Sequence, residues 1–228
     1  MIIGGMQKTS TIDFPGLLSC VLFCRGCDMN CFYCHNRDLI YSFGQSLDDD
    51  YVWEFLKKRA GLLDGVVISG GEPTLQKDLG DFIAEVKKLG YKVKLDTNGQ
   101  RPDVVKQLAE NKLIDYSAVD IKASFIEYLS VCGKEGFLKA AETIEVLQQA
   151  GVPFEVRTTL YPGLTYEDLI CILSSLAEMP RWRLNYFRMP EKYLEQDEER
   201  LQETALTQQD IEKVLPELLK IQPNLIYE

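Results

Sequence analysis

The sequence predicts an α/β protein with a mostly parallel sheet, folded as a partial (β/α)6 TIM-like barrel. Strand-like and helix-like segments alternate along the chain with little linker between them. There are six such strand–helix units, which suits a partial barrel better than the eight units of a closed one. With 228 residues, of which 46% are hydrophobic, the chain is long enough to enclose one sizeable core.

We expect a single domain over residues 1–228. It divides into an N-terminal strand and loop at 1–16, the barrel at 17–190 and an acidic C-terminal helix region at 191–228. The sequence contains no internal repeat and no low-complexity tract that would indicate a second domain.

The six barrel strands are expected where short buried segments follow turn residues. These segments are 17–24, 64–70, 91–97, 115–121, 153–160 and 182–188. Because a helical pattern follows each of them, consecutive strands are expected to run parallel.

Helices are expected between the strands, at segments with one apolar face. They are 48–60, 79–90, a helix opened by Pro102, one ended by Gly151, 165–179 and 207–220. We expect Ser46 to cap the first helix, with aspartates in its first turn. Pro216 lies inside the last helix and predicts a kink or an early stop there.

The chain is acidic, with a formal net charge of −10. Nine acidic and three basic residues lie between 191 and 217, which indicates either a solvated acidic surface or a docking surface for a basic partner. This charge argues against binding the phosphates of nucleic acid. No apolar run approaches the roughly 20 residues of a membrane helix, and the first residues, MIIGG, do not resemble a signal peptide. We therefore expect a cytoplasmic protein with neither nucleic-acid nor membrane partners.

Seven cysteines in a cytoplasmic chain argue against structural disulfides. Four of them look scattered: Cys20, Cys24, Cys132 and Cys171. Cys20 and Cys24 share one face of the first barrel strand and are expected in the core. Cys24 also lies close enough to Cys27 in the sequence to join a metal site.

The other three cysteines form a C-x3-C-x2-C motif at Cys27, Cys31 and Cys34, and His35 follows directly. A structural zinc site needs four ligands, and His35 is a poor fourth because it would have to bend round the same ion as its neighbour. Thiolates are the usual ligands of iron–sulfur clusters, and four of them normally hold a [4Fe–4S] cube. Three thiolates leave one iron open, so the motif favours a reactive cluster over zinc.

Further polar motifs stand at the ends of the following strands. They are SGGEP at 69–73, DTNG at 96–99 and DIK at 120–122, and Arg157 lies in the fifth strand. In a parallel barrel the carboxyl ends of the strands share one face, where the chemistry takes place. We expect thiolates, glycines, acids and two bases to meet on that face.

The three-cysteine motif, with the aromatic Tyr33 before its last cysteine, resembles the signature of radical S-adenosylmethionine (SAM) enzymes. The segment GGEP after the next strand strengthens this resemblance. The run 26–38, GCDMNCFYCHNRD, is similar to the glycyl-radical-enzyme activating family, which includes the activators of pyruvate formate-lyase and of anaerobic ribonucleotide reductase. The run 9–23 resembles the second of these groups. The resemblance extends over about residues 8–165 and implies a radical SAM domain.

The family resemblance implies a [4Fe–4S] cluster and SAM as cofactors. The reduced cluster would cleave SAM into methionine and a 5′-deoxyadenosyl radical, which would take the Cα hydrogen of a glycine in a partner glycyl radical enzyme. An anaerobic reaction and a flavodoxin- or ferredoxin-type electron donor are implied as well. The chain has no inserted cysteine-rich ferredoxin segment, so one cluster is expected.

The resemblance also implies roles for individual residues. Cys27, Cys31 and Cys34 would hold three irons, and SAM would chelate the fourth. Tyr33 and Asn36 would meet the adenine side of SAM. His35, between Cys34 and Asn36, is expected to pack beside the site rather than to catalyse.

Gly70, Gly71 and Glu72 match the segment that receives the methionine amino group. The two glycines allow a close backbone approach, and the Glu72 carboxylate can accept from an ammonium group. A tight turn closed by Pro73 is the structural alternative for this segment.

Asp96 matches a position that contacts SAM directly or through a bound cation. The ligands of a monovalent cation beside the SAM carboxylate match Asp96, Thr97, the backbone at Ala118, and Asp120. Oxygen ligands of this kind suit a hard cation. An aspartate at a strand end can instead cap the next helix.

Lys122 and Arg157 would pair with a carboxylate or steer the backbone of the partner protein; structural salt bridges are the alternative. Phe187 stands where the pyruvate formate-lyase activator has a histidine near SAM. The adenosyl contacts on that side are therefore expected to differ.

Two other functions stay open at the level of sequence. A radical SAM enzyme of this fold could act on a small molecule, because a fold does not determine a function. A non-catalytic iron–sulfur electron carrier would bind no SAM and would need no GGEP segment.

Overall fold

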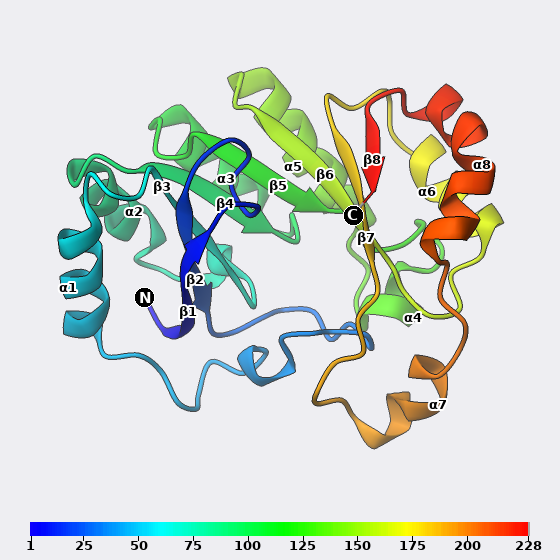
Figure 1. Cartoon of the computed structure of the whole chain (residues 1–228), viewed down its shortest axis with the longest axis horizontal. Helices are drawn as coiled ribbons and strands as arrows, with labels where there is room; N and C mark the ends of the chain where they lie inside the picture. Colours follow the sequence, from blue (N-terminus) through cyan, green and yellow to red (C-terminus); the bar gives the residue numbers. More distant parts are fainter. Residues whose placement is uncertain (228) are drawn as a thin grey trace.

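Eight strands form one sheet in the computed structural model, which describes residues 1–227, and their order in space is their order in the sequence. β1 (Ile3–Ser10) pairs antiparallel with β2 (Ser19–Cys24), and every later pair is parallel. The later strands are β3 (Gly65–Gly70), β4 (Lys92–Thr97), β5 (Tyr116–Asp120), β6 (Phe154–Leu160), β7 (Trp182–Tyr186) and β8 (Leu225–Tyr227). The curved sheet is open, with β1 and β8 at its two edges (Figure 1). The predicted partial barrel with a mostly parallel sheet is confirmed.

Helices connect the parallel strands and flank the sheet (Figure 1). They are α1 (Asp49–Arg59), α2 (Leu79–Lys88), α3 (Pro102–Glu110), α4 (Tyr128–Cys132), α5 (Phe137–Ala150), α6 (Tyr166–Ser174), α7 (Glu198–Leu201) and α8 (Gln208–Ile221). Three 3-10 turns complete the set: η1 (Arg37–Leu39), η2 (Pro73–Leu75) and η3 (Glu195–Asp197). Pro102 opens α3, and Gly151 ends α5 in the left-handed conformation, both as predicted.

The first helix is capped differently from the prediction. Asp48, not Ser46, is its N-cap, and the Asp48 carboxylate accepts hydrogen bonds from the backbone N–H groups of Asp50 and Tyr51. The aspartate wins because it stands directly before the first helical residue, whereas the serine is two residues too far away.

The last helix continues through Pro216, so of the two predicted alternatives, a kink or an early stop, the early stop is wrong. Ile211 and Leu218, on either side of the proline, are fully buried and dock both halves of α8 on the molecule. Pro216 and Glu212 are exposed, so water can satisfy the carbonyl that loses its intrahelical donor. Burial of the apolar face therefore outweighs the local penalty.

The two faces of the sheet bury different sets of residues. On β2, Cys20, Leu22 and Cys24 belong to the main core, on the side that the helices cover. Val21 and Phe23 alternate with them and point into the barrel lumen, where they belong to a second, smaller apolar cluster.

The smaller apolar cluster, which we call the barrel floor, closes the amino ends of the strands. The loop between β1 and β2 places Phe14 there, 4% exposed, against Tyr116 with ring centroids 6.1 Å apart. Gly65, at the start of β3, leaves space for this ring, because a Cβ atom at Gly65 would lie 2.8 Å from it. The floor is formed by Phe14, Val21 and Val67, with Leu17, Phe23 and Tyr116 packed against them.

Within residues 1–227, none of the helices is long and apolar enough to cross a membrane.

Replacing Phe14 by alanine should open the barrel floor. We expect the free energy of unfolding in urea to fall by about 3–5 kcal/mol, the usual cost of removing a buried phenylalanine ring. Ile12→Ala, at a position 68% exposed in the same loop, is the control and should change stability by less than about 0.5 kcal/mol. Equal effects of the two substitutions would contradict the role of Phe14 in the floor.

Candidate functional site

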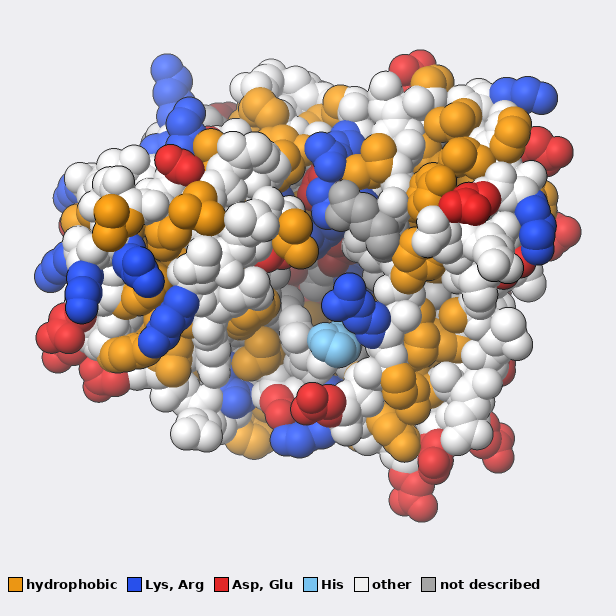
Figure 2. All heavy atoms as spheres, in the orientation of Figure 1, with side chains coloured by type: hydrophobic (Ala, Val, Ile, Leu, Met, Phe, Trp, Pro, Cys, Tyr) orange, Lys and Arg blue, Asp and Glu red, His pale blue; other side chains and the backbone are white. Residues whose placement is uncertain are grey.

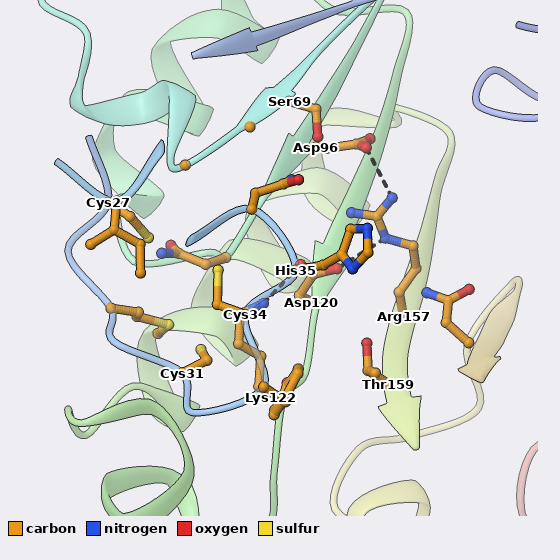
Figure 3. A pocket seen from close by; sticks show the side chains of 18 of the residues that line it. Cys27, Cys31, Cys34, His35, Ser69, Asp96, Asp120, Lys122, Arg157 and Thr159 are labelled. Carbon is orange, nitrogen blue, oxygen red and sulfur yellow. Dashed lines mark hydrogen bonds and ion pairs between the residues drawn. The ribbon is translucent and has the colours of Figure 1, made fainter. Parts of the chain in front are cut away.

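A cavity of about 310 Å³ lies at the carboxyl ends of the strands, opposite the barrel floor. Figure 2 shows a hollow on this face with basic side chains and the single histidine of the chain at its rim. Most residues that the sequence predicted for the site border this cavity together (Figure 3). They are Cys27, Cys31, Tyr33, Cys34, Asn36, Gly70, Gly71, Asp96, Thr97, Asp120, Lys122 and Arg157.

The loop that carries the three cysteines is fixed by its backbone. Gly26 and Cys27 donate to the carbonyl oxygens of Leu39 and Ile40, at 2.7 and 2.8 Å. Further along the loop, the N–H of Asn30 donates to the carbonyl of Cys132 at the end of α4, at 2.8 Å. Main-chain hydrogen bonds therefore hold the loop before and within the motif.

The three thiols of the motif line one cavity and are largely buried. Burial raises the pKa of Cys27 to about 12 and also raises the pKa of Cys34. The pKa of Cys31 is raised by a hydrogen bond with Cys132 and by burial. Lys122 acts in the opposite direction on all three, because its positive charge favours the thiolate.

These thiols surround a cavity rather than a single point. Among residues 1–227, no three cysteine, histidine or acidic side chains converge closely enough to hold one metal ion. All three thiols nevertheless border one cavity, as binding to a shared iron–sulfur cluster requires.

Cys24 does not belong to this arrangement. It lies in the core on the helix side of β2, fully buried, and burial raises its pKa to about 12. Cys132, which looked scattered in the sequence, instead lies beside Cys31. Only the fold could show this, because the two residues are far apart in the chain.

The turn after β3 touches the cysteine loop backbone to backbone. Gly71 donates to the carbonyl of Cys24 at 2.8 Å, and Glu72 donates to the carbonyl of Gly26 at 2.7 Å. Gly70 has φ +117°, and a Cβ atom there would overlap with the backbone of Cys24. A Cβ atom at Gly71 would overlap with the carbonyl of Gly26. Glycine is therefore required at both positions for this approach.

Glu72 lies apart from the other predicted site residues. Its carboxylate is fully buried and does not border the cavity. Oε1 accepts from the N–H and hydroxyl of Thr74, at 3.1 and 2.5 Å, and from the hydroxyl of Thr97 at 2.7 Å. Oε2 accepts from the N–H of Asn98 at 2.7 Å. Glu72 thus ties the glycine turn to the end of β4, a role that the spacing of the motif could not reveal.

Acids and bases alternate along one wall of the cavity. Arg157 donates from Nη1 to Asp96 Oδ2 and from Nε to Asp120 Oδ1, both at 2.9 Å (Figure 3). Lys122 Nζ donates to Asp120 Oδ2 at 3.0 Å. Burial by itself would raise the pKa of Asp120, but Arg157 and Lys122 outweigh it and lower the pKa to about 2. For Asp96, burial likewise raises the pKa, but the positive charges of Arg157 and Lys94 outweigh this effect and lower it.

The residues predicted to hold a monovalent cation do not fit one in this arrangement. The guanidinium of Arg157 lies between the carboxylates of Asp96 and Asp120, and Lys122 takes a further oxygen. The hydroxyl of Thr97 is engaged with Glu72. Positive charge is thus already supplied by side chains where the sequence predicted an ion.

The aromatic residue of the motif has a packing role as well as a place in the cavity wall. Tyr33 stacks on Tyr161, with ring centroids 5.2 Å apart and planes at 12°. Its hydroxyl is buried and has no hydrogen-bond partner within residues 1–227. His35 and Asn36 border the cavity beside it.

The sequence did not single out two polar residues that border the cavity. Thr159 lies two positions after Arg157 on β6, and Asn185 lies on β7. Their positions at the strand ends were a usable signal, because alternate residues of a barrel strand face the lumen. Phe187, expected beside SAM, also borders the cavity.

Comparison with known proteins places these motifs in a family context. The sequence model of the Radical SAM superfamily matches residues 21–176. A provisionally named glycyl-radical enzyme activating enzyme of Methanocaldococcus jannaschii is 35% identical over 205 residues, covering 86% of this chain and 83% of the relative. The pyruvate formate-lyase 1-activating enzyme of Escherichia coli is 31% identical over 179 residues, covering 73% of this chain and 70% of the relative.

Solved structures share the fold. Streptococcus suis SuiB bound to S-adenosylmethionine matches with a TM-score of 0.65 and 17% sequence identity. The match covers 91% of this chain and 51% of SuiB, so the chain spans about half the length of that protein. At this identity the likeness concerns the fold alone.

Gly71→Ala should strain the contact between the glycine turn and the cysteine loop. The added methyl group would meet the backbone of Gly26, and we expect the free energy of unfolding in urea to fall by about 1–3 kcal/mol. The control is Gly80→Ala in α2, where the new Cβ would meet neighbours only at 3.8 and 3.9 Å. That substitution should be neutral or stabilising by up to about 1 kcal/mol. A neutral Gly71→Ala variant would contradict the close approach.

The ion pairs of Asp120 predict a pH dependence of stability. Its folded pKa of about 2 lies below the ordinary value of 3.8, so its stabilising contribution is complete above pH 3.8 and is lost as the pH falls towards 2. The contribution amounts to about 2 kcal/mol. Urea unfolding should show the wild type more stable than Asp120→Asn above that range, with a difference that shrinks on acidification.

The control for this titration is Asp50→Asn, at an exposed position in the first turn of α1. It should leave the acid limb of the stability profile close to that of the wild type. A wild-type advantage over Asp120→Asn that stays constant with pH would contradict the assigned ion pairs.

Proposed function

The chain belongs to the radical SAM superfamily, and we propose that it is a glycyl-radical-enzyme activase that takes the Cα hydrogen of a glycine in a partner protein. The observation that carries this proposal is the meeting of three thiols, a glycine turn and paired acids and bases around one cavity. The superfamily uses a [4Fe–4S] cluster and SAM, and the activity is that of an oxidoreductase. The glycine substrate is supported by the names of the two relatives described above.

The residues of the cavity fit these two cofactors. Cys27, Cys31 and Cys34 would hold the cluster, since all three border the cavity and the motif offers no fourth cysteine. When bound, the cluster supplies an electron that cleaves the sulfonium of SAM and so generates the 5′-deoxyadenosyl radical. The cavity volume of about 310 Å³ lies within the range of small-molecule sites.

The chain's own groups would bind and orient SAM. The backbone at Gly70 and Gly71 borders the cavity where no side chain obstructs a ligand. Asp96 can accept from the ammonium group of the methionine moiety, and Lys122 and Arg157 can pair with its carboxylate. Because Lys122 and Arg157 are held by Asp120, these charges are already oriented before SAM binds.

Lys122 has a second role towards the thiols. Its positive charge lowers the pKa of Cys27, Cys31 and Cys34 against the effect of burial. It therefore helps these residues to release their protons when metal binds, since only the thiolate is a ligand.

A direct experiment tests the activase function. Anaerobically reconstituted, reduced protein should convert SAM into methionine and 5′-deoxyadenosine. Addition of the partner glycyl radical enzyme should produce a doublet in the electron paramagnetic resonance spectrum. A flavodoxin- or ferredoxin-type protein should replace the chemical reductant.

Two cysteine variants make the controls for this reaction. Cys34→Ala should lose the cluster and SAM cleavage, whereas Cys171→Ala, at an exposed cysteine of α6, should keep both. A redox-active cluster without SAM cleavage would reject the enzyme in favour of an electron carrier. SAM cleavage driven by a metabolite, with no radical in any glycyl radical enzyme, would reject protein activation in favour of a small-molecule substrate.

A further inference from the structure

A buried lysine outside the cavity connects Asp96 to the barrel floor. Lys94 lies on β4, two residues before Asp96, and is 1% exposed. Its Nζ lies 3.0 Å from Asp96 Oδ1 and 3.5 Å from Glu155 Oε1. It also donates to the carbonyl oxygen of Asp13 at 2.6 Å. The ammonium thus has one hydrogen bond, to the carbonyl of Asp13, and two carboxylates within ion-pair distance.

The acceptors below Lys94 are themselves fixed. Glu155, on β6 and 1% exposed, has Oε2 at 3.3 Å from Arg181 and at 3.4 Å from Arg183. The carbonyl of Asp13 belongs to the loop that fills the barrel floor. Lys94 is therefore anchored by two parts of the scaffold that do not border the cavity.

Asp96 divides its two oxygens between two bases. Oδ1 contacts Lys94, and Oδ2 accepts from Arg157. Asp96 borders the cavity, as Figure 3 shows, whereas Lys94 does not. A base thus stands at each oxygen of Asp96, and the two contacts act on the carboxylate from opposite sides of the cavity wall.

Filling space does not account for charged groups at this depth. The neighbouring part of the lumen is filled by apolar side chains, among them Val21 and Val67. Replacing a buried ion pair by apolar residues of similar volume is often neutral or stabilising. The position of Lys94 between Glu155 and Asp96 is therefore better explained by an effect on the orientation of the Asp96 carboxylate than by a gain in the stability of the fold.

We propose that Lys94 is a positioning residue, which holds the carboxylate of Asp96 in the orientation that binds SAM. This inference rests on the proposed function in so far as SAM is the ligand of the cavity. Lys94 itself does not touch SAM. It is held by the loop of the barrel floor through Asp13, and its ion pair with Asp96 restrains the side chain of Asp96 at the ligand site.

Calorimetric titration of SAM into the reconstituted protein with its cluster oxidised tests this inference. Without a reductant no turnover occurs, so the titration measures binding alone. Lys94→Met should weaken SAM binding about tenfold, which corresponds to a typical coupling energy between residues in contact. Lys92→Met, an exposed position on the same strand, is the matched control and should bind SAM as the wild type does. Wild-type affinity in Lys94→Met would overturn the inference.

A double-mutant cycle asks whether Lys94 acts through Asp96. On the background of Asp96→Asn, adding Lys94→Met should cause little further loss of SAM affinity. An equal, independent loss on both backgrounds would overturn the positioning role, because Lys94 would then act by another route.

A second variant covers the case in which Lys94→Met does not fold. Lys94→Met combined with Glu155→Gln removes the opposing charges together and should restore folded, cluster-loaded protein with weakened SAM binding. If neither variant folds, Lys94 is a stability element and the inference is wrong. If the wild type itself binds no SAM, the proposed function fails, an outcome distinct from equal binding by wild type and variant.

Discussion

The guanidinium of Arg157 joins the strands of the site, because it contacts the carboxylates of Asp96 on β4 and Asp120 on β5 from its own place on β6. A charged group left alone at this depth would be strongly destabilising. The ion pairs continue on both sides of Arg157. Asp120 also pairs with Lys122 near the thiols, and Asp96 also pairs with Lys94 near the barrel floor, so each charged group depends on its neighbours. Ion pairs between neighbouring parallel strands thus fix the charged side chains on this side of the lumen.

The other side of the site depends on backbone contacts instead of charge. The glycine turn after β3 lies against the cysteine loop after β2 with no side chain between them, and Glu72 fixes the turn from behind. Two adjacent parallel strands bring these loops together. Hydrogen bonds of the main chain position the cysteine loop before and within the motif. Because the loop is already ordered, little conformational entropy of its residues is lost when a cofactor binds.

Together the two halves make a site with a rigid wall on each side and an apolar floor. Positive charge stands where an ion was expected from sequence resemblance, in the form of Arg157 between two aspartates. Phe187 borders the cavity at the position where the resemblance implied a histidine. These two features differ from what resemblance by itself implies, whereas the cysteine motif and the glycine turn border the same cavity.

The sequence by itself determined the alternation of strands and helices, the open parallel barrel and most of the predicted residues that border the cavity, because each is encoded locally. Periodicity shows buried strands, and parallel strands must bring motifs such as Cys27–Cys34 and Gly70–Gly71 to one edge. Only the tertiary structure decided which partner each polar group has. Glu72 turned away from the cavity to Thr97 and Asn98, Cys132 came to lie beside Cys31, and Lys94 met Glu155. Tertiary contacts also decided the course of α8, which continues past Pro216 because its apolar face is buried on both sides of the proline. Pairing of this kind depends on contacts between residues far apart in the chain, which local pattern does not encode.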